Sequence, residues 1–256
     1  MTQQLQINNV TKRFGGLRII EGFDLELQAG ARHAIIGPNG AGKTTLFNMI
    51  SGWLVPTSGN ISIDGKNIAG MSPEKVTEAG LARSFQKNTL FEGLSVLESL
   101  RLSIQARSRA RFNFLAAASS FKDIIEQACI AAEKMNLQDV LDRQVKTLSY
   151  GQKRQLEVAM ALACSPKILL LDEPAAGTSP AERTLLMQLL NELPKEMTLL
   201  LVEHDMDVVF GVCSQITVLN YGRAVVTGTP EEIRQNEDVR AAYLGKSLDQ
   251  DGGRHE

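Results

Sequence analysis

The residues with the clearest chemical pattern form a glycine-rich segment near the N-terminus, which we name the phosphate loop (residues 37–45). It reads Gly37-Pro38-Asn39-Gly40-Ala41-Gly42-Lys43-Thr44-Thr45 and matches the spacing G-x-x-x-x-G-K-[ST] in full. Glycines let successive backbone N–H groups turn toward an anion without a Cβ in the way. Lys43 would add a point charge for the β- and γ-phosphates, and the Thr44 hydroxyl would ligate Mg²⁺. The segment therefore predicts a nucleoside triphosphate site.

Two acidic residues follow an apolar run in the second half of the chain. Residues 168–171 predict a buried strand, and Asp172 and Glu173 stand at its end. Ligands of open α/β sheets bind at this carboxyl edge. We expect Asp172 to hold Mg²⁺, directly or through water, and Glu173 to accept a proton from the attacking water or to orient it. An acid pair after a strand is ordinary by itself, so its function depends on the phosphate loop upstream.

The elements that must position these groups follow from the spacing of apolar residues. Ala34–Ile36 predicts a short buried strand before the phosphate loop, and a helix opens at Lys43 after it. Period-two alternation and an Asp-Gly turn predict an antiparallel β portion at the N-terminus. Its strands and hairpin cover residues 5–10 and 23–28, joined across Gly15-Gly16, and 61–66. Strand patterns return at residues 168–171, 198–202 and 216–220.

Between about residues 90 and 165 the pattern changes to helical spacing, as in Val96, Leu97, Leu100 and Ile104. We predict a helical subdomain inserted between two parts of a parallel sheet. The fold class is thus α/β, with a mixed sheet, an N-terminal antiparallel portion and a helical insertion in one domain of residues 1–256. The core takes about 1–89 and 166–245, and the polar tail 246–256 is predicted to fray.

Composition excludes several classes of protein. A chain of 256 residues with 43% hydrophobic content suits one large domain, and a net charge of −2 gives no general attraction to nucleic acid. No basic segment leads into an apolar run at the start, so we expect no secretory signal. Apolar runs fall far below the ~20 residues that cross a bilayer. The chain has three widely spaced cysteines, Cys129, Cys164 and Cys213. We predict that they are small buried apolar residues and that they form neither disulfides nor a metal site.

A third segment, which we name the signature (Leu148-Ser149-Tyr150-Gly151-Gln152), precedes a predicted helix for which Ser149 is a good N-cap. As local structure it need be no more than a capped helix. In chain order, however, the phosphate loop, Gln86, the signature, the acid pair and His204 together resemble the ATP-binding-cassette (ABC) family. The resemblance covers about Leu5 to Gly245 and implies a P-loop ATPase core that binds ATP with Mg²⁺.

The resemblance implies further roles. Phe14 matches the aromatic residue that stacks on adenine, Gln86 the glutamine that senses Mg²⁺ and the attacking water, and His204 the histidine that contacts the γ-phosphate. Each has an alternative that does not need the resemblance: a core residue for Phe14, a solvated loop residue for Gln86 and a capped strand-end histidine for His204. The signature residues that would contact ATP held by a second subunit are Ser149, Gly151 and Gln152.

The sequence departs from the commonest family forms at two points. Tyr150 replaces the first glycine of the usual signature. Ser179 stands where many relatives have aspartate, so it cannot carry the contact that the aspartate makes between subunits. The segments 174–180, 203–209, 227–233 and 242–245 together resemble the ATPases of branched-chain amino-acid-type importers. That subgroup also serves urea, short amides and aromatic acids.

The subgroup implies partners and a place. The ATPase would form a homo- or heterodimer, bind transmembrane permease subunits at the cytoplasmic face of the membrane, and serve an external substrate-binding protein indirectly. Alternatives are the ATPase of a urea or lipid transporter, a soluble ABC ATPase acting on DNA or ribosomes, and a small-molecule kinase. The second normally carries paired cassettes, a coiled coil or a basic surface, and the third would leave the signature and His204 unexplained.

Overall fold

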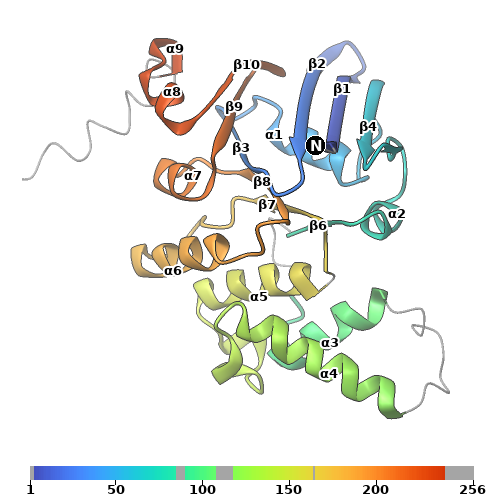
Figure 1. Cartoon of the computed structure of the whole chain (residues 1–256), viewed down its shortest axis with the longest axis vertical. Helices are drawn as coiled ribbons and strands as arrows, with labels where there is room; N and C mark the ends of the chain where they lie inside the picture. The colour runs from blue at the N-terminus through green and yellow to red at the C-terminus, as the bar shows by residue number, and fades with distance from the viewer. Residues whose placement is uncertain (1–2, 85–89, 108–117, 164, 240–256) are drawn as a thin grey trace, which may run out of the picture.

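The computed structural model describes residues 3–84, 90–107, 118–163 and 165–239, and their side chains except at 106, 107, 118–121 and 238. Within these ranges the strands form a four-stranded sheet in the order β2-β1-β4-β5 and a six-stranded sheet in the order β10-β9-β3-β8-β7-β6 (Figure 1). The strands are β1 (Gln3–Phe14), β2 (Leu17–Gln28), β3 (Arg32–Ile36), β4 (Ser58–Ile63), β5 (Lys66–Asn67), β6 (Leu81–Arg83), β7 (Ile168–Asp172), β8 (Thr198–Val202), β9 (Gln215–Asn220) and β10 (Arg223–Gly228).

The smaller sheet is antiparallel, as the alternation of its residues predicts. β1 pairs with β2 across Gly15-Gly16 and with β4 on its other side. β4 and β5 form the expected hairpin. Both turn residues have positive φ, 48° at Asp64 and 77° at Gly65, which is the conformation that an Asp-Gly turn favours.

The larger sheet is parallel from β9 to β6, with β10 added antiparallel at one edge. Every residue of β7 and β8 is buried, because helices cover both faces of a parallel sheet. The phosphate loop follows β3, the acid pair ends β7, and His204 follows β8. Since β3 and β7 both pair with β8, these three groups leave the sheet at adjacent carboxyl ends.

Helices pack on both faces of this sheet (Figure 1). Leu46 and Phe47 of the first helix share a core with Ile168 and Leu170, whereas Leu156 of a later helix shares the other core with the alternate residues of β7. The helices are α1 (Lys43–Ile50), α2 (Pro73–Glu78), α3 (Val96–Arg107), α4 (Ala118–Glu133), α5 (Tyr150–Ala163), α6 (Pro180–Asn191), α7 (Met206–Val212), α8 (Pro230–Gln235) and α9 (Glu237–Val239), with 3-10 turns η1 (Gln138–Val140) and η2 (Val145–Thr147). Helices α1 and α5 therefore lie on opposite faces of β7.

The chain between β6 and β7 contains α3, α4, α5 and the two 3-10 turns, joined by short loops in the described residues. In the residues that the structure describes, every helix is too short or too polar to serve as a membrane span. Cys213 is buried and burial raises the pKa of its thiol to about 12. Cys129 is only half-buried, less than expected, and Cys164 lies outside the described residues.

A buried histidine makes the stability of the fold sensitive to pH. His33 on β3 is buried beside Thr217 of β9, 2.8 Å from ring Nε2 to the hydroxyl, and burial lowers its pKa from 6.5 to about 4. The His33 ring therefore binds a proton more readily in the unfolded chain than in the folded one. The stability that the neutral ring contributes above pH 6.5 is consequently lost as the pH falls toward 4.

We expect His33→Gln, which cannot titrate, to lose less stability than the parent chain on acidification. Urea unfolding at about pH 7.5 and about pH 4.5 should give a difference between the two proteins of about 2.5 kcal/mol in the pH-dependent loss. Equal losses in both would mean that folding leaves the pKa of His33 unchanged.

Candidate nucleotide-binding site

The phosphate loop has the backbone that its glycines predict. Gly42 has φ 107° at the N-terminus of α1, a left-handed conformation that side chains disfavour. A Cβ on Gly37 would lie 2.2 Å from the carbonyl oxygen of Leu219, so the loop packs directly on β9. The backbone N–H groups at this helix start are available to an anion. Pro38, Asn39, Gly40 and Thr44 are exposed, Gly37 and Thr45 are half-buried, and Ala41 and Gly42 are buried.

Lys43 is buried within its own loop. Its ammonium donates to the carbonyl oxygens of Gly37, at 2.6 Å, and Pro38, at 3.0 Å. Burial lowers the pKa of this amine, while the nearby carboxylates of Glu173 and Asp172 oppose that shift. The Lys43 ammonium thus lies close to both acids, and its two hydrogen bonds stabilise the conformation of the phosphate loop. An arriving phosphate would replace two neutral acceptors with charged ones.

The two acids at the end of β7 have different surroundings. The Asp172 side chain is 0% exposed and its Oδ2 accepts from Arg83 Nη2 at 2.7 Å. Glu173 is partly exposed and has φ 51°, unusual for a residue other than glycine. Its N–H donates to Val202 of β8 at 2.8 Å, which holds this backbone turn. Backbone strain of this kind clusters at functional sites.

Asp172 and Thr44 offer the donor set that Mg²⁺ uses. The Oδ1 atom of Asp172 is buried and has no hydrogen-bond partner among the described residues. Magnesium usually binds one or two carboxylates together with substrate phosphates, rather than a cage made only of protein. In the described part of the chain, no group of three or more His, Cys, Asp or Glu side chains is placed to hold a metal ion. The residues present therefore fit Mg²⁺ bound with a nucleotide.

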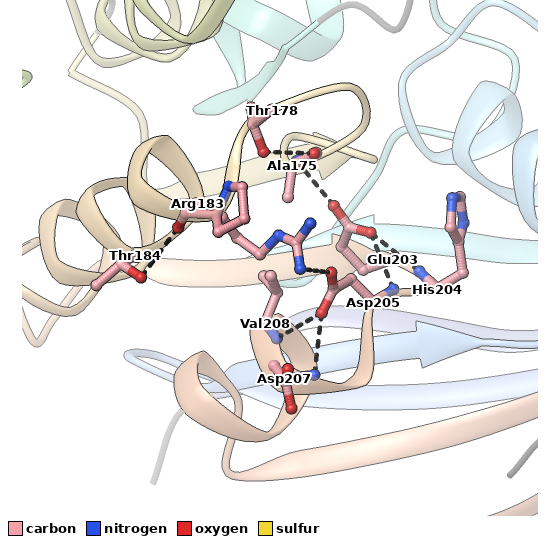
Figure 2. A network of polar contacts seen from close by, with 10 residues as sticks. Ala175, Thr178, Arg183, Thr184, Glu203, His204, Asp205, Asp207 and Val208 are labelled. Atoms are coloured by element: carbon pink, nitrogen blue, oxygen red, sulfur yellow. Dashed lines mark hydrogen bonds and ion pairs between the residues drawn. The ribbon is translucent and has the colours of Figure 1, made fainter. Parts of the chain in front are cut away.

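His204 and Glu173 lie together beyond the ends of β8 and β7. The His204 Nδ1 is 3.4 Å from Glu173 Oε1, and the imidazole is largely exposed. The neighbouring Glu203 is buried, and its carboxylate accepts backbone N–H groups of Ala175, at 2.8 Å, and His204, at 3.0 Å (Figure 2). Burial raises the pKa of Glu203, and these donors oppose the shift. Glu203 therefore ties the segment after the acid pair to the segment that carries His204.

Asp205 continues this network into the next helix (Figure 2). Its carboxylate caps α7 by accepting from the N–H groups of Asp207 and Val208. The same carboxylate pairs with Arg183 of α6 at 2.6 Å. Helices α6 and α7 are thus joined directly behind His204.

The signature begins α5, and Ser149 is its N-cap as predicted. The Ser149 hydroxyl accepts from Gln152 N, and Gln152 Oε1 accepts from Ser149 N, both at 3.1 Å. A carboxylate from α6 also occupies the signature: Glu182 Oε1 accepts from the Ser149 hydroxyl at 2.9 Å and from Gly151 N at 3.1 Å. Across the described residues, no hydrogen bond or ion pair joins the signature to the phosphate loop of the same chain.

The two departures from the usual motifs have local structural roles. The Tyr150 ring covers Gly177, and its hydroxyl accepts from Arg154 Nη2 at 2.8 Å. Ser179 caps α6 in a capping box with Glu182. The pattern Ser-x-x-Glu before an apolar run is a sequence signal for this cap, and it would have identified Glu182.

Other predicted residues are separate from this cluster. Phe14 ends β1 and is 51% exposed, with Lys12 Nζ 5.1 Å from its ring centroid, so it is not a core residue. Gln86 lies outside the described residues. Sequence reasoning gave no role to Arg83, Glu182 or Glu203. Arg83 stands only three positions before Gln86, but nothing in that spacing indicates its contact with Asp172.

Comparison with known proteins agrees with this geometry. A family model described as "ABC transporter" matches residues 20–176, more than half of the chain and all three of the phosphate loop, signature and acid pair. The chain belongs to the ABC transporter family. A second model, "Branched-chain amino acid ATP-binding cassette transporter", matches residues 225–249 of this ABC ATPase.

Relatives of this ABC ATPase match over nearly the full length. The high-affinity branched-chain amino acid transport ATP-binding protein BraF of Pseudomonas aeruginosa is 41% identical, with 95% of this chain and 98% of that protein covered. An ATP-binding cassette of an ABC transporter in its ADP conformation superposes with a TM-score of 0.83 at 26% identity, covering 96% and 100% of the two chains. A dimeric cassette bound to ADP and phosphate gives 0.75 at 25% identity, covering 88% and 98%. The predicted α/β ATPase fold is confirmed.

Proposed function

We propose that this ABC ATPase energises an importer of branched-chain amino acids, or of related small amide or aromatic-acid substrates, through partner membrane subunits. The match of residues 225–249 carries the proposal. That segment lies outside the catalytic motifs, which importers and exporters share. The similarity to BraF over nearly the whole chain supports the same class of cargo.

The site residues divide the work on ATP. The phosphate loop and Lys43 bind the β- and γ-phosphates, and Phe14, exposed at the end of β1, stacks on adenine. Thr44, Asp172 and Gln86 would hold Mg²⁺, which when bound neutralises phosphate charge. Glu173 orients the attacking water or accepts its proton, and His204, 3.4 Å away, contacts the γ-phosphate.

The hydrolytic site is completed by a second ATPase subunit, identical or related. The signature and the phosphate loop of one chain begin helices on opposite faces of β7. Ser149 and Thr44 are both exposed, which supports contact across a dimer rather than within one chain. In a dimer with two-fold symmetry, the signature of each subunit would meet the ATP of the other. The γ-phosphate then contacts both chains, and ATP favours the closed dimer by its differential affinity. Hydrolysis removes that bridge.

The membrane permease would bind between the core (about 1–89 and 166–245) and the helical subdomain (about 90–165). A cavity of about 270 Å³ lies here, and Leu81, Ser84, Leu90 and Met160 are among its lining residues. Trp53 also lines this cavity and is 59% exposed, a large apolar group that supports a docking role. With such a contact the ATPase would lie at the cytoplasmic face of the membrane. It would reach the external binding protein only through the permease, and we expect no nucleic acid partner.

Reconstitution tests this function. The chain, a partner ATPase, the permease subunits and the external binding protein are combined in liposomes, and uptake of labelled leucine, isoleucine and valine is followed. We expect ATP-dependent uptake that stops when the binding protein is omitted. Uptake of urea alone would move the chain to another importer class, and outward movement of a lipid would refute import.

A further inference from the structure

Arg83 hydrogen-bonds to three side chains beside the acid pair. It ends β6, and its side chain is 9% exposed. Nη2 donates to Asp172 Oδ2 at 2.7 Å, while Nη1 donates to Asn48 Oδ1 at 2.7 Å and Ser51 Oγ at 2.9 Å. Asn48 and Ser51 belong to the end of α1. The guanidinium is therefore fixed from one side by the helix that follows the phosphate loop and holds the carboxylate on the other.

This arrangement separates the two oxygens of Asp172. Oδ2 is occupied by Arg83, whereas Oδ1 is buried without a hydrogen-bond partner among the described residues. A fully buried carboxylate is costly unless a cation or donors compensate it. Lys43 is already engaged by carbonyl oxygens of its own loop, so Arg83 is the cation that contacts Asp172 directly.

We propose that Arg83 is a positioning residue for Asp172, which orients the free carboxylate oxygen toward the bound divalent cation. This inference rests on the proposed role of Asp172 as a metal ligand. Carboxylates that bind metals are themselves held by hydrogen bonds, and loss of such a partner typically weakens metal binding about 10- to 100-fold. A purely electrostatic effect on metal affinity would have the opposite sign. Removal of the positive charge of Arg83 would reduce its repulsion of the divalent cation and so strengthen metal binding.

Binding of Mn²⁺ measures this role without catalysis. Free Mn²⁺ is followed by electron paramagnetic resonance during titration of the chain saturated with the non-hydrolysable analogue β,γ-imido-ATP. We expect Arg83→Gln to raise the Mn²⁺ dissociation constant about 10-fold and leave binding of the analogue in EDTA unchanged. Unchanged or tighter Mn²⁺ binding would overturn the proposal.

Arg32→Gln provides a matched control. Arg32 also extends from a strand, β3, and donates to three acceptors, which are the carbonyl oxygens of Leu190, Leu193 and Pro194. Loss of a part-buried arginine there should cost stability without changing Mn²⁺ affinity. Thermal unfolding of both variants separates the two effects.

Two further variants make the outcome decisive. Asp172→Asn should weaken Mn²⁺ binding by itself. If Asp172→Asn weakens Mn²⁺ binding and Arg83→Gln does not, Asp172 remains a ligand and the role of Arg83 is refuted. If Asp172→Asn leaves Mn²⁺ binding unchanged, both the ligand assignment and the role of Arg83 are refuted. If Arg83→Gln does not fold, Arg83→Lys is tested instead, because one ammonium cannot contact Asp172, Asn48 and Ser51 together. We expect this variant to bind Mn²⁺ about 3-fold more weakly than the parent chain. Parental affinity would refute the proposal.

Discussion

Replacement of Glu173 by glutamine should lower the rate of ATP hydrolysis about 100- to 10,000-fold, the usual contribution of a positioned general base. Glutamine preserves the size of the side chain but cannot accept a proton. The strained backbone at φ 51° and its hydrogen bond to Val202 do not depend on the carboxylate, so the loop should keep its form. ATP binding should survive. Release of phosphate from the purified chain is the measurement.

The same substitution should accumulate an ATP-bound dimer, because the γ-phosphate that bridges the subunits is no longer removed. Size-exclusion chromatography with ATP, compared with ADP, checks this result. Glu196→Gln, at an exposed position before β8, is the control and should hydrolyse ATP at the parental rate. Normal steady-state turnover in Glu173→Gln would refute the assigned role.

Lys43→Met should weaken ATP binding about 10- to 100-fold, since each charge-assisted hydrogen bond contributes about 1.5–3 kcal/mol. Methionine keeps an unbranched side chain but removes the ammonium that the phosphates would contact. The loop loses its internal bonds to Gly37 and Pro38 as well, so part of the effect comes from its shape. A fluorescent ATP analogue titrated in EDTA measures the affinity without metal.

Lys66→Met is the matched control for charge. Lys66 is exposed on β5, and its loss should leave nucleotide affinity unchanged. Retained affinity in Lys43→Met would show that the backbone N–H groups of the loop suffice. Equal loss in both variants would indicate a general electrostatic effect rather than a contact with phosphate.

Patterns local in sequence predicted most of the fold and part of the site. The loop-to-helix transition at Lys43, the strand before Asp172 and the cap at Ser149 all depend on residues within a few positions of one another. The contacts that sequence reasoning missed join distant residues. Arg83 meets Asp172 across 89 positions, and Ser149 meets Glu182 across 33. Only the order of strands and the packing of α6 beside α5 bring these groups together.

The placement of β6 determines how Asp172, the proposed metal ligand, is supported. In the described structure β6 is an edge strand of three residues, paired only with β7, and all three line the cavity beside α2. Few backbone hydrogen bonds resist its displacement, in contrast to β3, which is paired on both sides. The shortest strand of the larger sheet thus carries the side chain that holds Asp172. A partner that displaces β6 at the cavity would therefore also displace Asp172, through the single guanidinium of Arg83. Amide hydrogen exchange should be faster in β6 than in β3.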